Sequence, residues 1–128
     1  MVSWNVTSCF QSKSKLKPSG RARIKIHVSD SWRNAILSVD NTANENVISR
    51  RLVIEVLGTE IAVIDKETAE FVRTRLSGEE LEGYVDLTWC FEENTYRVQK
   101  LRLYVTTDHD PPYDVRLGKQ AAKSYNLA

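Results

Sequence analysis

The chain has 128 residues, a length that can bury one hydrophobic core but not two, so the sequence predicts a single domain. Hydrophobic residues make up 41% and charged residues 27% of the chain, proportions that exclude a wholly disordered protein. No apolar run reaches the roughly 18 residues that a membrane-spanning helix needs. The two cysteines and two histidines have no metal-ligand spacing, so we expect no metal site and no cofactor.

The net charge of +1 conceals an uneven distribution of charge along the chain. Residues 1–29 carry six basic and no acidic residues, whereas the remainder carries 12 basic and 17 acidic residues. Residues 1–20 are rich in Ser and Lys, and we expect a flexible basic arm there, followed by a folded core over residues 21–128. The residues predicted to bind a membrane surface or another polyanion are Lys13, Lys15, Lys17, Arg21, Arg23 and Lys25.

The first half of the core contains one strand pattern and one ambiguous segment. Residues 22–28 alternate between apolar and polar side chains, which predicts a half-buried strand with a basic exposed face. Residues 31–37 continue as strand or turn, and the Asn-rich stretch 40–46 predicts a loop. Apolar residues at helical spacing over residues 48–56 and the following Gly58 favour a helix, whereas the β-branched residues also fit a strand over residues 52–56.

The second half predicts a helix and a hairpin. Asp65 is a candidate N-cap for a helix over residues 66–76, with a strand over residues 71–76 as the alternative. Alternating apolar residues up to Trp89, an acidic turn and a return strand to Val105 predict an antiparallel hairpin. Two prolines in residues 108–113 indicate that the sheet ends there and that a loop or short helix follows. These elements predict an α+β fold, with an antiparallel sheet packed against one or two helices.

Catalytic motifs are missing from the sequence. It contains no P-loop, G-x-G-x-x-G, H-E-x-x-H or G-x-S-x-G pattern, so we do not expect an enzyme. The densest acidic cluster consists of Glu79, Glu80 and Glu82. One interpretation is a solvated polar turn; the other, which we predict, is a self-association site that receives the basic arm of a neighbouring copy.

Two stretches of the sequence carry a family resemblance. The longer has the acidic run 78–82, then Thr88-Trp89, an acidic turn, and a strand of alternating apolar and basic residues to Val105. The shorter includes residues 20–26, Ser31-Trp32-Arg33 and the apolar pair at 36–37. In these residues the chain resembles the matrix proteins of rhabdoviruses, most nearly those of the lyssavirus type.

The resemblance implies a disordered basic arm before an α+β core, and it makes residues 71–76 a strand. It implies a viral matrix-like structural protein that bridges the membrane, the viral nucleocapsid or RNA, and copies of itself. Such a protein would lie in the host cytoplasm and at the inner face of the host membrane or virion. The chain is much shorter than a usual matrix protein, and its arm has no proline-rich late-budding motif. The alternative is therefore a small viral accessory protein of similar fold that binds host proteins.

Overall fold

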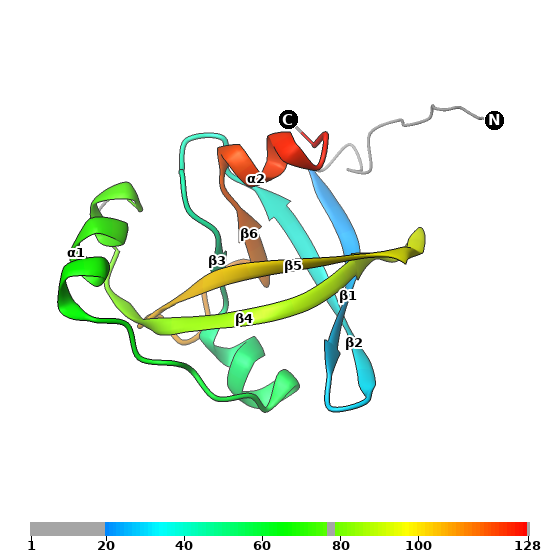
Figure 1. Ribbon diagram of the computed structural model, residues 1–128, viewed down its shortest axis with the longest axis horizontal. Coiled ribbons are helices and arrows are strands. Elements are labelled where there is room, and N and C mark those ends of the chain that lie inside the picture. The colour runs from blue at the N-terminus through cyan, green and yellow to red at the C-terminus, as the bar shows by residue number, and fades with distance from the viewer. Residues whose placement is uncertain (1–19, 77–78, 128) are drawn as a thin grey trace.

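The computed structural model describes residues 20–76 and 79–127, and two hairpins form its main sheet (Figure 1). Strands β1 (Arg21–Val28) and β2 (Ser31–Val39) are antiparallel and are joined by a two-residue turn in which both residues have positive φ. Strands β4 (Leu81–Phe91) and β5 (Asn94–Thr106) form the longer hairpin. Because β4 also pairs with β1, the two hairpins make one continuous antiparallel sheet.

Two very short strands close this sheet into a barrel. Strand β3 (Val47–Ile48) pairs in parallel with β5. Strand β6 (Val115–Leu117) lies between β3 and β2, antiparallel to β3 and parallel to β2. The order around the closed barrel is β1-β2-β6-β3-β5-β4. When β6 is set aside, the other five strands keep the order β2-β1-β4-β5-β3 with a gap between β2 and β3, an arrangement similar to the partly open Greek-key barrel of the OB-fold.

The helical segments are short and lie outside the barrel wall (Figure 1). A π-helical segment, η1 (Leu52–Leu57), ends at Gly58, whose φ of 63° suits glycine. Helix α1 (Lys66–Arg75) begins after Asp65, whose carboxylate accepts the N–H of Thr68. Helix α2 (Lys119–Ser124) follows β6 directly. Both η1 and α2 contribute buried side chains to the core of the barrel.

Alternation of side chains along the strands fills the barrel, because successive residues of a strand point to opposite faces of the sheet. In β1, for example, Ala22, Ile24 and Ile26 are almost fully buried while the residues between them are exposed or half-buried. The principal strand residues of this core are Ala22, Ile24, Ile26, Leu37, Val85, Leu87, Trp89, Leu103, Val105, Val115 and Leu117.

The expected α+β fold is wrong. The strands close into a barrel, and the helices are short segments rather than a layer packed on an open sheet. The expectation that the sheet ends at residues 108–113 is also wrong, because the chain re-enters it as β6 immediately afterwards. The two prolines lie in the loop before β6, where they remove no hydrogen bond from the strand ladder.

Several local predictions are confirmed. The strand over residues 22–28 is β1, the hairpin is β4–β5, and the helix over residues 66–76 is α1. The alternative strand over residues 71–76, which the family resemblance also implies, is wrong. The ambiguous segment 48–56 divides between β3 and η1, so each interpretation describes part of it. Residues 1–19 of the expected arm lie outside the described residues.

Trp89 links the sheet to the C-terminal helix, so its removal should destabilise the barrel. Its side chain is 2% exposed and makes edge contacts with the rings of Phe91 and Tyr125, at centroid distances of 5.1 and 5.2 Å. We predict that Trp89→Ala lowers the free energy of unfolding by about 3–5 kcal/mol, measured by urea denaturation. Tyr96→Ala is the control, because Tyr96 is 97% exposed and its loss should change stability by less than about 0.5 kcal/mol. Equal effects of the two substitutions would contradict this role for Trp89.

Candidate functional site

The outer wall of the first hairpin carries a mixed basic and aromatic surface. The side chains of β1 that do not enter the core stand opposite those of β2 in the pairs Arg21↔Ser38, Arg23↔Ile36, Lys25↔Asn34 and His27↔Trp32. The Lys25 ammonium donates a hydrogen bond to the side-chain oxygen of Asn34 at 3.2 Å. These eight residues are called the β1–β2 face below.

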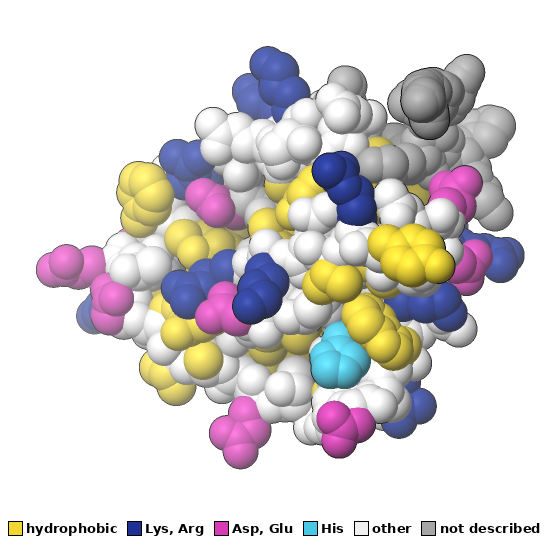
Figure 2. Space-filling view, turned by 45° about the vertical axis from the view of Figure 1, so that its right-hand side comes forward, with side chains coloured by type: hydrophobic (Ala, Val, Ile, Leu, Met, Phe, Trp, Pro, Cys, Tyr) yellow, Lys and Arg dark blue, Asp and Glu magenta, His cyan; other side chains and the backbone are white. Residues whose placement is uncertain are grey.

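The strand registers extend one row of this face across four strands. Trp32 lies opposite His27, His27 opposite Thr88 on β4, and Thr88 opposite Lys100 on β5. The rings of His27 and Trp32 are 4.8 Å apart between centroids, and Trp32 is 43% exposed. Figure 2 shows a histidine ring against hydrophobic side chains, with both basic and acidic side chains around them. The row therefore has an accessible aromatic ring at one end and a cation, Lys100, at the other.

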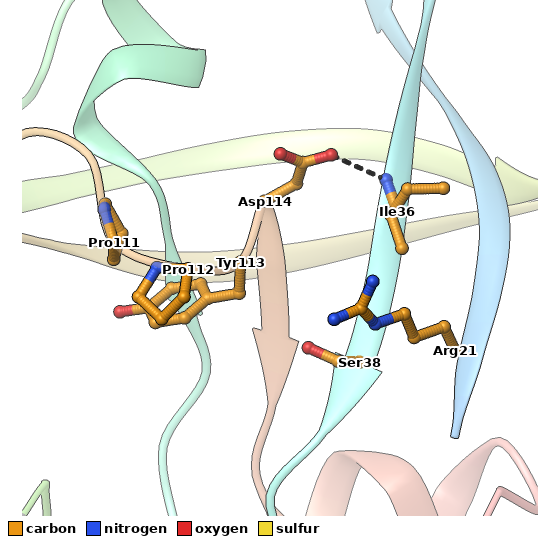
Figure 3. Close-up of a pocket in the computed structure, with 7 residues that line it drawn as sticks. All are labelled: Arg21, Ile36, Ser38, Pro111, Pro112, Tyr113 and Asp114. Atoms are coloured by element: carbon orange, nitrogen blue, oxygen red, sulfur yellow. Dashed lines mark hydrogen bonds between the residues drawn. The ribbon is translucent and has the colours of Figure 1, made fainter. Parts of the chain in front are cut away.

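Two adjacent hollows lie over the β2 side of this face. The first has a volume of about 250 Å³ and lies between the β1–β2 face and residues 111–114 (Figure 3). The second, of about 270 Å³, shares Ile36 and Asp114 with the first and adds Arg23, Asn34, Ala35 and Glu92. A hydrogen bond of 2.9 Å, from the Ile36 N–H to the Asp114 carboxylate, separates the two. In Figure 3 the Arg21 guanidinium points from β1 toward the space beside Pro112 and Tyr113.

The cations of the β1–β2 face and Lys100 on β5, like Arg33 and Arg97, have no ionic partner among the described residues, whereas six other arginines do. Among residues 20–76 and 79–127, Arg21, Arg23, Lys25 and Lys100 form no ion pair. Their charge is thus available to an anionic ligand. The arginines that are neutralised locally form the pairs Arg50–Glu82, Arg51–Asp110, Arg73–Glu70, Arg75–Glu45, Arg102–Asp86 and Arg116–Glu79.

The structure brings together only part of the predicted polyanion site. Arg21, Arg23 and Lys25 share the outer wall of β1, whereas the predicted residues Lys13, Lys15 and Lys17 lie outside the described part of the chain. Sequence reasoning did not assign Trp32 or Lys100 to this site. The period-two pattern of residues 32, 34 and 36 could have indicated the shared face of β2, but the position of Lys100 depends on β4–β5 pairing.

The acidic cluster predicted for self-association is paired within the protein. Glu79 accepts a hydrogen bond from Arg116 at 2.9 Å, and Glu82 accepts one from Arg50. Glu80 lies 3.8 Å from the Arg73 guanidinium. Because each carboxylate already has an arginine neighbour, the cluster presents much less free negative charge than the sequence indicates. A role in self-association stays a prediction.

Searches for other kinds of site, and for relatives, give negative findings. In the described ranges, no group of three or more His, Cys, Asp or Glu side chains is arranged to hold a metal ion. No helix in those ranges is both long and apolar enough to cross a membrane. Comparison with protein-family models and with curated proteins finds no match. The β1–β2 face is therefore the feature of the described structure from which a function is inferred.

Arg102 lies on the neighbouring outer wall, where Asp86 takes up its charge. Its guanidinium donates hydrogen bonds of 2.8 and 3.0 Å to Asp86 and stacks 3.9 Å over the Tyr84 ring. The hydrogen bond from Arg102 lowers the pKa of Asp86 below its ordinary value of 3.8. The pair therefore contributes stability above that ordinary pKa and loses it as the pH falls through the lowered value.

We predict that Arg102→Gln raises the pKa of Asp86 toward 3.8, because the charged hydrogen-bond donor is removed. The measurement is an NMR titration of the side-chain carboxyl carbon. Asp65 is the internal control: the Thr68 backbone N–H lowers its pKa, and the substitution should leave that pKa unchanged. An unchanged Asp86 pKa would show that Arg102 is not its partner in solution.

Proposed function

We propose that this protein is a non-enzymatic binding protein that holds single-stranded RNA along the β1–β2 face. The observation that carries the proposal is the continuous row Trp32, His27, Thr88 and Lys100, flanked on β1 by the unpaired cations Arg21, Arg23 and Lys25. Unpaired cations attract the phosphate backbone, and an exposed aromatic ring beside them can stack on a base.

The chemistry of the face favours binding with little sequence preference. Phosphate contacts carry no sequence information, and stacking on Trp32 accepts any base, because every base has a π face. Two carboxylates, Asp114 and Glu92, line the hollows on the β2 side. The phosphates are therefore expected to follow β1 and Lys100, with the bases directed toward Trp32 and Asn34. Greek-key barrels of the OB type bind oligonucleotides on their outer wall, but the side chains of the face, rather than the fold, support the proposal.

Acidic residues at the tips of the two hairpins make RNA a better ligand for the β1–β2 face than an anionic membrane. The β1–β2 turn carries the exposed Asp30, and the β4–β5 turn carries the exposed Glu92 and Glu93. Both hairpins project from the barrel (Figure 1). A flat anionic bilayer that reached the β1 cations would also meet these carboxylates, whereas a flexible single strand can pass between the tips.

The proposal keeps the nucleocapsid- or RNA-directed part of the matrix-like hypothesis. The α+β core that the family resemblance implies is not present, and since both the matrix-like protein and the small accessory protein were expected to have that core, the barrel does not distinguish between them. The viral setting, the host-cytoplasmic location, the host-protein partners and the absence of catalysis stay predictions.

The β1 cations can be tested with a charge-matched pair of triple variants. We predict that replacing Arg21, Arg23 and Lys25 together by Gln weakens binding of a labelled oligouridylate at least about tenfold, measured by fluorescence anisotropy. The plot of log K against log salt should become less steep by about two, since each single-strand phosphate contact contributes roughly 0.7 to the slope and three contacts are lost.

The control replaces three exposed lysines of the helices, Lys66, Lys119 and Lys123, by Gln, which removes the same charge from other surfaces. This control should bind within about twofold of the unchanged protein. Equal losses of oligouridylate affinity in both variants would show that only the net charge of the protein matters. That result would contradict a binding site on the β1–β2 face. Sedimentation with phosphatidylserine vesicles through the β1 cations, without RNA binding, would assign the face to membranes.

Trp32 should contribute through stacking rather than charge. We predict that Trp32→Ala weakens oligouridylate binding about fivefold to a hundredfold, because stacking on one aromatic ring is worth about 1–3 kcal/mol per base. The salt slope should not change, since no phosphate contact is lost. Trp32→Phe should retain most of the affinity, and Tyr96→Ala, on an exposed ring outside the row, should retain all of it. Full affinity in Trp32→Ala would remove the aromatic part of the proposal.

A further inference from the structure

The outer edge of β2 is only partly covered by the strand that closes the barrel. Strand β6 pairs with Leu37, Ser38 and Val39, and β2 begins six residues earlier, at Ser31. The Ile36 N–H points away from β1, because it donates to the Asp114 carboxylate just beyond the paired segment. The first part of β2, residues 31–36, thus has a sheet neighbour on the β1 side alone.

Two residues of this edge expose backbone hydrogen-bonding groups. In an antiparallel pair, alternate residues direct both N–H and C=O away from the partner strand, so Trp32 and Asn34 project these groups in the same direction as Ile36. Within the part of the chain that the structure describes, no backbone partner meets them. An exposed edge of this kind is a template for another strand.

We infer that this edge binds an extended acidic peptide segment of a partner protein, which adds to the sheet as a further strand. The side chains beside the edge indicate which residues the peptide segment should contain. On the outer face stand Trp32 and Ile36, which are 43% and 36% exposed. On the opposite face stands Arg33, which is exposed and forms no ion pair within residues 20–76 and 79–127.

Cross-strand neighbours then determine the pattern of the added strand. Its side chains alternate between the two faces, so apolar residues meet Trp32 and Ile36 while acidic residues meet Arg33. Arg23 and Lys25, one strand further in, add positive potential that favours an acidic segment. Asp114 limits the segment at the Ile36 end, because its carboxylate occupies the next N–H.

A second copy of this chain fits the edge less well by charge. Two β2 edges paired about a two-fold axis would bring Arg33 of both copies near one another on one face of the joined sheet. They would also place two sets of β1 cations on its other face. Like charges on neighbouring strands are destabilising, so the edge favours a partner of opposite charge.

The inference shares Trp32, Arg23 and Lys25 with the RNA proposal, but it also depends on the β2 backbone groups and on Arg33, which RNA binding does not use. The probe is a capped, fluorescent peptide of about seven residues in which valine alternates with glutamate, titrated with the full chain. Asn34→Pro removes one outward N–H, and proline is tolerated where an edge N–H faces away from the sheet. We predict that Asn34→Pro and Arg33→Glu each weaken peptide binding at least about tenfold.

The controls are Asn34→Ala, which keeps the backbone N–H, and Lys66→Glu, which reverses an exposed charge on α1. Both should bind the peptide within about twofold of the unchanged protein, and thermal melting should show that all four variants fold. No binding of the peptide, equal binding of a peptide with lysine in place of glutamate, or indifference to Arg33→Glu would each overturn the inference. A dimer in analytical ultracentrifugation that Asn34→Pro abolishes would assign the edge to a second copy and overturn it as well. Peptide binding without RNA binding would support this inference and contradict the proposed function. RNA binding without peptide binding would support the proposed function and contradict this inference.

Discussion

The insertion of β6 between β2 and β3 is the interaction on which the rest of the structure depends. Val115 and Leu117 are almost fully buried in the barrel core, and β6 is hydrogen-bonded to a strand on each side. Its pairing with β2 stops at Val115, because the next β2 group, the Ile36 N–H, donates to the Asp114 side chain and not to a backbone carbonyl. The barrel is therefore closed beside residues 37–39 of β2, whereas residues 31–36 have no strand on that side in the described structure. The hollows over the β1–β2 face and the free β2 edge both follow from this incomplete seam.

The charge distribution follows from the same topology. Arg116 of β6 reaches Glu79 and Asp40, and so ties the closing strand to the segment before β4 and to the loop after β2. The carboxylates of Glu79, Glu80 and Glu82 consequently have arginine partners within the protein. On β1, by contrast, the residues opposite the two arginines are Ser38 and Ile36, which carry no charge. Strand register, rather than the number of basic residues, leaves positive charge free on that wall.

The residues that carry the resemblance to rhabdovirus matrix proteins have a structural explanation in the barrel. Trp89, Leu103 and Val105 face the core of the long hairpin, and the pair Glu92–Glu93 forms its turn. Any buried antiparallel hairpin with a polar turn needs a similar alternation of side chains. The resemblance is therefore weak support for a matrix role, since packing alone accounts for much of it, and the binding face provides a more direct argument about function.

Features that depend on neighbouring residues could be predicted from the sequence: the alternation that makes β1 and the long hairpin, the Asp65 cap of α1 and the glycine that ends η1. The way in which these elements pack together could not be predicted in this manner. Strands of two and three residues, such as β3 and β6, leave no periodic pattern in a sequence, so barrel closure could not be predicted. The row from Trp32 to Lys100 and the pairing of Glu79 with Arg116 join residues far apart in the chain. Such contacts depend on strand order and register, which are set by long-range hydrogen bonding and core packing rather than by local propensity.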